Sequence, residues 1–220
     1  MTFIISGLSL AIYMKVNQVM LKEMSDAVSV GNYAVTVKLS ELWYFIPMTI
    51  ASSVFPSIIS SREHSKEKYY NRLQYFYDIM VAMAFLIAIP MTFLSEIIIE
   101  LLFGTEYKLA GAIVSIHMWS GIFVFLGVAR GKWIITENFQ FYGMIFTITG
   151  AVVNVVLNLL FIPEYGGIGA ALAIVVSQAL SAWLLAGLFE KTRSAFKQHS
   201  VSFLHIYICL SNNKFSKNDY

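Results

Sequence analysis

The chain has 220 residues, of which 58% are hydrophobic and 13% are charged, and its formal net charge is +2. Soluble domains carry about 25% charged residues, so this composition is typical of a membrane protein. The small net charge argues against a nucleic-acid partner. The single cysteine, Cys209, excludes an internal disulfide and a cysteine-based metal cluster, and the four histidines lack metal-ligand spacing. We therefore expect neither a metal nor a cofactor.

The chain contains apolar runs of about 20 residues, the length that a helix needs to cross a hydrocarbon core of about 30 Å. They cover residues 2–21, 31–60, 73–95, 109–135, 139–162 and 168–189. The predicted fold is all-α, a polytopic membrane protein whose roughly six transmembrane helices form one lobe over residues 1–190. Residues 191–220 are expected to form a poorly defined cytoplasmic tail.

The first two runs carry charges within apolar sequence. Lys15 and Asn17 make the later half of the first run polar on one side, and the second run contains Lys38 and Glu41. A charge inside a membrane helix costs about 2.5–3.5 kcal/mol and usually faces a bundle interior or a wet cavity. Lys38 and Glu41 are three residues apart, so they share a helix face and can partly neutralise each other. Two interpretations stay open: a polar stripe that lines a cavity, and a purely structural pair.

Other residues predict how the helices bend and pack. Pro47 and Pro56 each remove an amide donor and predict a kinked second helix. Asn154 and Asn158 are one turn apart, which favours hydrogen bonds between helices over substrate contacts. A tight turn is predicted at 163–167. The sixth run is rich in small residues, which allow close approach of helices: Gly169, Ala170, Ala173, Ser177 and Ser181.

The basic residues outside the apolar runs predict an orientation. One side of the membrane receives Arg62, Lys66, Lys68, Arg72, Arg130, Lys132, Lys191, Arg193 and Lys197. The other side receives only Lys22 and Lys108. The first side is therefore predicted to be cytoplasmic, with both termini on that side.

This orientation places Lys15 and Lys38 in the outer half of the membrane. Two cations on consecutive helices could form a basic pocket for an anionic headgroup such as a phosphate. Alternatively, Lys15 reaches the outer surface and Lys38 only pairs with Glu41. Arg130 is a further candidate, or a topology charge at the inner surface, and His117 is expected to be a satisfied packing histidine. The sequence shows no nucleophile–base pair and no phosphate-binding glycine loop, so we do not expect an enzyme.

Five phrases, in this order, resemble a known family. They are YMKVNQVML (13–21), VGNYAVTVKLSELWYFIPMTIASSVFPSI (30–58), LLFGTEYKLAG (101–111), WSGIFVFLGVARGKWIITEN (119–138) and VVNVVLNLLFIPEYGGIGAALAIVVSQ (152–178). They resemble the polysaccharide repeat-unit flippases, the Wzx-type O-antigen transporters of the multidrug/oligosaccharidyl-lipid/polysaccharide exporter superfamily. The resemblance covers about residues 1–190. Lys38 in the VKLSE phrase matches the family pattern, whereas Asn17 stands where relatives often have an acidic residue.

The resemblance implies a function and partners. Such proteins have two lobes and move undecaprenyl-pyrophosphate-linked oligosaccharides across the bacterial inner membrane, for O-antigen, lipopolysaccharide or capsule synthesis. Their cavity is cationic, which supports Lys38 as a substrate-binding residue; together with Lys15, Glu41 and Arg130 from the analysis above, it makes up the expected substrate-binding set. This chain looks like the C-terminal lobe, with a missing N-terminal lobe as a partner beside membrane lipids and the lipid-linked oligosaccharide. The alternatives are a multidrug exporter of the same superfamily and a non-transporting membrane subunit or truncated product.

Overall fold

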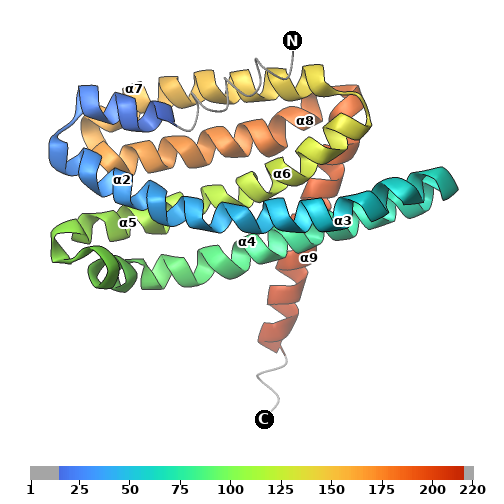
Figure 1. Cartoon of the computed structure of the whole chain (residues 1–220), viewed down its shortest axis with the longest axis horizontal. Helices are drawn as coiled ribbons and strands as arrows, with labels where there is room; N and C mark the ends of the chain where they lie inside the picture. Colours follow the sequence, from blue (N-terminus) through green and yellow to red (C-terminus); the bar gives the residue numbers. More distant parts are fainter. Residues whose placement is uncertain (1–14, 216–220) are drawn as a thin grey trace.

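A computed structural model describes residues 15–215 as a helical bundle crossed by a C-terminal helix (Figure 1). No strand occurs within residues 15–215. An all-helical chain satisfies its backbone hydrogen bonds internally, as the interior of a bilayer requires. The predicted all-α, polytopic fold is therefore confirmed.

A helix over residues 15–24 precedes a continuous series of elements. They are α2 (Ala27–Glu41), the 3-10 turn η1 (Leu42–Tyr44), α3 (Phe45–His64), α4 (Lys66–Phe103), the 3-10 turn η2 (Thr105–Tyr107), α5 (Lys108–His117), α6 (Ser120–Thr136), α7 (Gln140–Ala179), the π-helical turn η3 (Leu180–Leu184), α8 (Leu185–Leu188), the 3-10 turn η4 (Glu190–Thr192) and α9 (Arg193–Phe215).

Three helical stretches in the described part of the chain are long and apolar enough to cross a membrane: Ala27–Glu63, Lys66–Phe103 and Gln140–Leu188. A fourth arises if Thr105–His117 and Ser120–Thr136, which meet at an angle of 47°, count as one bent span. These stretches contain the apolar runs predicted from residue 31 onward. The first predicted span, residues 2–21, lies for the most part outside the described residues.

The helix α7 turns back on itself at Gly166. The backbone φ of Gly166 is 52°, a value that an L side chain rarely adopts, and α7 continues on both sides of it. Asn154 on the first limb donates to Ser177 Oγ on the second, with an Nδ2–Oγ distance of 3.3 Å. A Cβ atom on Gly169 would collide with the carbonyl oxygen of Phe161. The predicted turn and the predicted close packing of small residues are both confirmed, and the two limbs account for the fifth and sixth predicted spans.

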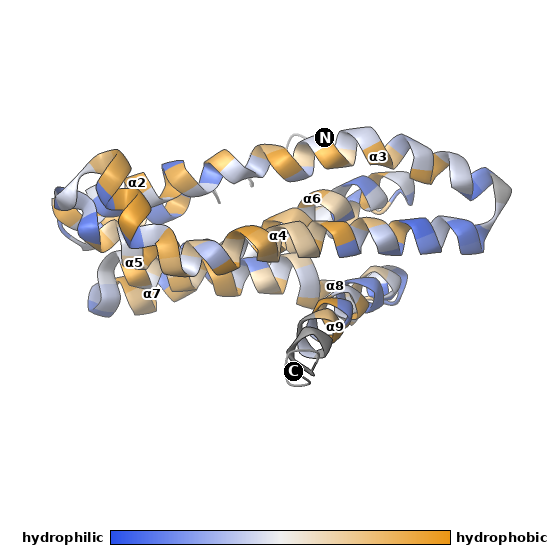
Figure 2. Cartoon of the chain, turned by 90° about the horizontal axis from the view of Figure 1, so that it is seen from below, coloured by the Kyte–Doolittle hydropathy of each residue, from blue (hydrophilic) through white to orange (hydrophobic). Residues whose placement is uncertain are grey.

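The connections between spans gather at two opposite ends of the bundle. At one end, Arg62 forms an ion pair with Glu137 at 3.1 Å, which joins the end of α3 to the α6–α7 turn. At the other end, the Gly166 turn lies against Ser29 near the start of α2. Figure 2 shows hydrophilic residues at the Arg62 end of α3 and α4 and hydrophobic residues along the middle of α4. This arrangement has the alternation on which the predicted orientation depends.

The helix α9 lies across the bundle rather than along it (Figures 1 and 2). Ser202 Oγ donates to Asp78 Oδ1 of α4 at 2.6 Å, and His205 Nδ1 lies 3.0 Å from Asp78 Oδ2. The His199 ring packs edge-on against Tyr77, with ring centroids 4.5 Å apart. The expected tail thus contains a helix that packs on α4.

Candidate functional site

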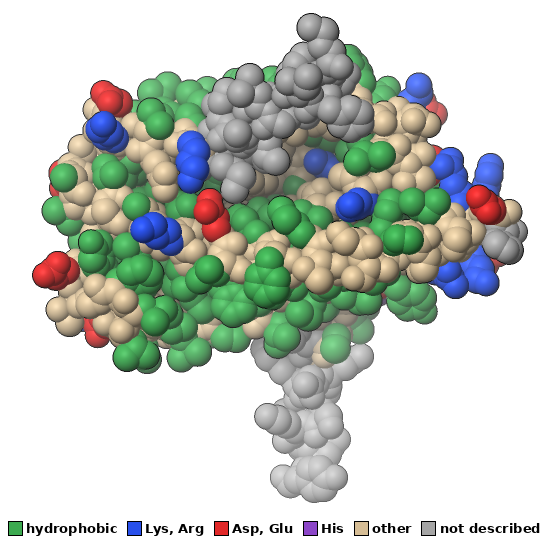
Figure 3. Space-filling view, viewed as in Figure 1, with side chains coloured by type: hydrophobic (Ala, Val, Ile, Leu, Met, Phe, Trp, Pro, Cys, Tyr) green, Lys and Arg blue, Asp and Glu red, His purple; other side chains and the backbone are tan. Residues whose placement is uncertain are grey.

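A cavity of about 320 Å³ lies between α2, α6, the second limb of α7 and η3. Its lining is mostly apolar, but polar side chains from several elements reach it: Asn17, Tyr33, Glu41, Arg130, Gln178 and Ser181. Figure 3 shows one face of the molecule, on which a recess opens near the centre and separate basic side chains stand around it. Cavities of about 300–1,000 Å³ are the size that small ligands or headgroups occupy in proteins.

Arg130 is the buried cation of this cavity. Its side chain is 7% exposed, and its Nη1 donates to the backbone carbonyl of Ser181 at 2.6 Å. The guanidinium carbon lies 4.9 Å from the centre of the Phe146 ring, a cation–π distance. The buried Nε atom has no hydrogen-bond partner, and no carboxylate in residues 15–215 forms an ion pair with Arg130. Arg130 therefore has a donor and a charge to offer a ligand.

The local backbone structure brings Ser181 within reach of Arg130. The chain adopts one π-helical turn at Leu180–Leu184, and such turns often occur at functional sites. Gly150 on the first limb of α7 packs so closely on Ser181 that a Cβ on Gly150 would lie 2.6 Å from the Ser181 Cβ. The glycine thus lets η3 approach α7 beside the cavity.

The structure separates the four predicted site residues into two groups. Glu41, the last residue of α2, and Arg130 both line the cavity. Lys15 and Lys38 are exposed, and neither is among the described residues that line it. The predicted neutralisation of Lys38 by Glu41 is wrong: within the described chain no ion pair joins them, because Lys38 points to the surface while Glu41 faces the cavity.

A buried polar network supports one wall of the cavity. Asn17 Nδ2 donates to Tyr33 Oη at 2.7 Å and to the Ala170 carbonyl at 3.3 Å. Asn158 Nδ2 donates to Asn17 Oδ1 at 2.7 Å and to Asn154 Oδ1 at 3.3 Å. Asn154 and Asn158 therefore act as the predicted hydrogen-bonded contacts between helices. Asn17, which itself lines the cavity, joins three helices in this network.

His117 closes another part of the wall. Its side chain is 5% exposed and packs edge-on against Tyr33, with ring centroids 5.9 Å apart. No described residue forms a hydrogen bond with its buried Nδ1 atom. The expectation of a packing histidine is confirmed for the ring, which packs against Tyr33.

The sequence analysis missed Gln178 and Ser181 as cavity residues. The signal for them was present, because two polar residues three positions apart within an apolar run share a helix face. In the described residues, no group of three or more His, Cys, Asp or Glu side chains could hold a metal ion. Among the described residues, the site is a mostly apolar cavity that several polar side chains and the buried cation Arg130 reach.

The chain is similar to proteins whose names describe flippases. Two such relatives come from the archaeon Haloferax volcanii. The chain is 28% identical to "Probable flippase AglR" over 165 residues. This matched region covers 70% of the chain and 33% of the relative. It is 24% identical to "Probable low-salt glycan biosynthesis flippase Agl15" over 156 residues. This matched region covers 69% of the chain and 32% of the relative.

The matched region thus spans about a third of the length of these curated relatives. No family model matches the chain, and no solved structure matches it.

Proposed function

We propose that this chain is the C-terminal lobe of a flippase that moves lipid-linked oligosaccharides across a membrane. The observation that carries the proposal is Arg130, a buried cation that lines a cavity of about 320 Å³ and has no carboxylate partner within residues 15–215. The similarity to the two archaeal flippases supports the same class of substrate. The chain acts as a transporter and not as an enzyme.

The chemistry of Arg130 favours a phosphate as the ligand. An ionisable side chain inside a membrane is expensive, so its position marks a functional site unless it is paired. The planar guanidinium matches the geometry of phosphate oxygens, and hydrogen bonds between two charged groups are the stronger kind. The Nε atom, which has no hydrogen-bond partner among the described residues, is the donor that we propose for such a ligand. The cavity volume suits a phosphate-bearing headgroup better than an entire oligosaccharide.

The family resemblance supports a more specific proposal for the substrate. We infer an undecaprenyl-pyrophosphate-linked repeat unit, moved across the bacterial inner membrane for O-antigen or capsule synthesis. Lys15 and Lys38 are proposed to attract the phosphate groups from the surface, because exposed cations raise the local concentration of an anionic ligand. Glu41 would then contact the sugar hydroxyls.

Transport requires a second lobe. Alternating access occurs at the interface of two repeats, and the relatives are about three times as long as the region they match. We therefore propose an N-terminal lobe as the partner. We also propose that both termini of the present chain lie in the cytoplasm.

The direct test measures binding of undecaprenyl pyrophosphate to the purified chain in lipid nanodiscs. Arg130→Gln is expected to weaken binding at least tenfold. The matched control is Arg62→Gln, which removes an exposed arginine that pairs with Glu137 away from the cavity. Equal binding by the Arg130→Gln variant and the unmodified chain would contradict the proposal.

The apolar part of the cavity lining keeps a second candidate open. Val37, Met48, Phe123 and Val124 face the cavity and would suit a lipophilic drug. A multidrug exporter would lower drug accumulation in cells, whereas a glycan flippase would not. Restored surface polysaccharide with unchanged drug accumulation, after co-expression with a matching first lobe, would favour the flippase over both the exporter and a non-transporting subunit.

A further inference from the structure

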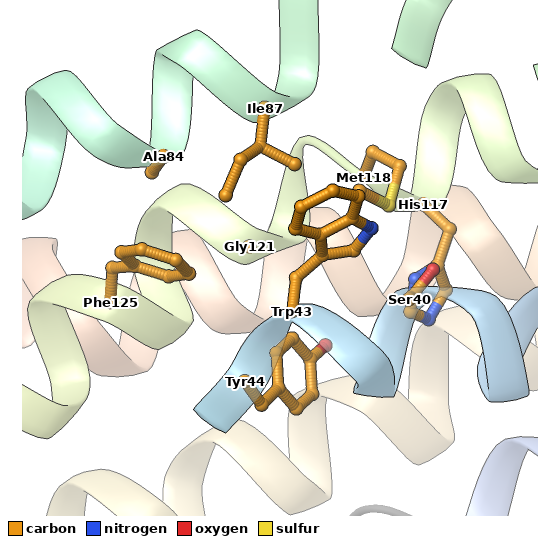
Figure 4. Close-up of a pocket in the computed structure, with 9 residues that line it drawn as sticks. All are labelled: Ser40, Trp43, Tyr44, Ala84, Ile87, His117, Met118, Gly121 and Phe125. Carbon is orange, nitrogen blue, oxygen red and sulfur yellow. The ribbon is translucent and has the colours of Figure 1, made fainter. Parts of the chain in front are cut away.

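A second, much smaller pocket lies where two broken helices meet (Figure 4). It is bounded by η1, by α4 and by the break between α5 and α6. The volume that the centre of a water molecule can occupy in this pocket is about 10 Å³. This is close to the minimum of roughly 10–15 Å³ that one water molecule needs. We call it the small pocket.

Three polar atoms in the wall of the small pocket have no hydrogen-bond partner in the described part of the chain. They are Ser40 Oγ, Trp43 Nε1 and His117 Nδ1, and each atom is buried. Such atoms are rare because an unpaired buried polar group loses its hydration without compensation. They come from different parts of the chain, since Ser40 and Trp43 lie around the α2–η1 junction and His117 ends α5. A shared ligand would satisfy all three.

The donors and acceptors identify the ligand. The indole N–H of Trp43 only donates, a hydroxyl both donates and accepts, and a neutral imidazole nitrogen does one or the other. A metal cation is disfavoured because the indole N–H would point its hydrogen at it, and polyatomic anions are too large for the pocket. A water molecule accepts from Trp43, donates to His117 Nδ1 and still exchanges a hydrogen bond with Ser40.

We propose that one water molecule binds in the small pocket and joins Ser40, Trp43 and His117. This inference goes beyond the proposed transport function and does not depend on it. The water would lie between two helix interruptions, the 3-10 turn η1 and the 47° break between α5 and α6. Tyr44 and His117 line both the small pocket and the large cavity. The water therefore supports the wall of the cavity from behind.

The test compares melting temperatures of the purified full chain in one detergent. With water bound, Ser40→Ala deprives the water of a partner and is expected to lower the melting temperature by about 2–4 °C. In a dry pocket the same change removes an unsatisfied hydroxyl, so the melting temperature would stay equal or rise. A drop thus supports the bound water, and no change or a rise overturns it.

A double variant separates the water from simple packing. Trp43→Phe loses packing area in either case, but with a shared water the Ser40→Ala/Trp43→Phe variant should lose less than the sum of the single losses. The matched control is Trp133, whose buried Nε1 also lacks a partner but which does not line the small pocket. Ser40→Ala and Trp133→Phe should be additive. Additive losses for Ser40 and Trp43 as well would overturn the proposal.

A structure at a resolution that shows ordered waters gives the direct answer. An electron-density peak for a water molecule within about 2.7–3.2 Å of Ser40 Oγ, Trp43 Nε1 and His117 Nδ1 supports the proposal. A refined site without such a peak, or three side chains bonded to each other instead, overturns it.

Discussion

The Nη1 atom of Arg130 donates to the backbone carbonyl of Ser181 at 2.6 Å, so a buried cation on α6 contacts the π-helical turn η3 at the edge of the cavity. The contact fixes one end of the guanidinium, and within residues 15–215 the Nε atom has no hydrogen-bond partner. A charge buried for stability alone would be expected to have a carboxylate partner, since the desolvation of an unpaired ion is costly.

Arg130→Met should therefore separate stability from function. Methionine has a similar length and no charge, so the melting temperature is expected to fall by no more than a few degrees or to rise. Phosphate-lipid binding should be lost. A thermal melt and a binding titration on the same sample make the comparison, and a large drop in melting temperature would show that the charge serves the fold.

The Asn17–Asn158 hydrogen bond should contribute to the stability of the lobe. Asn158→Leu removes the donor to Asn17 Oδ1 and is expected to cost about 0.6 kcal/mol, the average for hydrogen bonds between membrane helices, and at most about 1.7 kcal/mol. Leu159→Ala, at a neighbouring residue that is 54% exposed, is the control and should have a smaller effect. Unfolding in denaturing detergent provides the measurement, and equal effects would argue against the network.

Two glycines should respond oppositely to the same substitution. Gly169→Ala places a methyl group against the Phe161 carbonyl and is expected to destabilise the lobe by about 1–3 kcal/mol. Gly131→Ala meets no atom of the described chain within 4 Å, so higher helix propensity should stabilise α6 by up to about 1 kcal/mol. Melting temperatures of the two variants check both signs. A stable Gly169→Ala variant would mean that the limbs of α7 lie farther apart.

The docking of α9 should weaken in acid because of His199. Burial, with a smaller effect from the positive charge of Arg130, lowers the pKa of His199 to about 3 from its usual 6.5. Between these values the unfolded histidine binds a proton and the folded one does not. Stability is therefore complete above about pH 6.5 and falls toward pH 3, by up to about 1.4 kcal/mol per pH unit.

His199→Phe keeps the ring contact with Tyr77 and removes this titration. The difference in melting temperature between the two proteins should shrink or reverse as the pH falls from 7 to 4, while the Asp78–His205 contact is the same in both. A difference in melting temperature that stays the same from pH 7 to pH 4 would contradict this prediction. It would mean that His199 is protonated or solvated in the folded protein.

The predicted orientation can be tested with single cysteines. In a C209S background, Arg62→Cys should react with an impermeant thiol reagent only from the cytoplasmic side, and Glu164→Cys, beside the Gly166 turn, only from outside. The reverse pattern would invert the orientation, and labelling of both from one side would contradict the alternation itself.

Much of the fold was predictable because bilayer physics constrains it strongly. The hydropathy runs located the spans, and the glycine–proline turn located the reversal of α7. The contact between Arg130 and Ser181 was not predictable, because it depends on a π-helical turn that no residue pattern near Leu180 announces. The exposure of Lys38 and the position of Glu41 in the cavity wall could not be predicted for a similar reason. A separation of three residues leaves them about 60° apart around a helix, and tertiary packing decides which one faces the cavity.

The crosswise direction of α9 has a mechanical consequence. The helix α9 packs on α4 and also on α8, so it connects the third span, in α4, to the last span, which ends in α8. Spans joined in this way cannot tilt independently without breaking the contacts at Tyr77 and Asp78. The lobe should therefore rotate as a stiff body during any change in access, with bending confined to the helix interruptions beside the cavity.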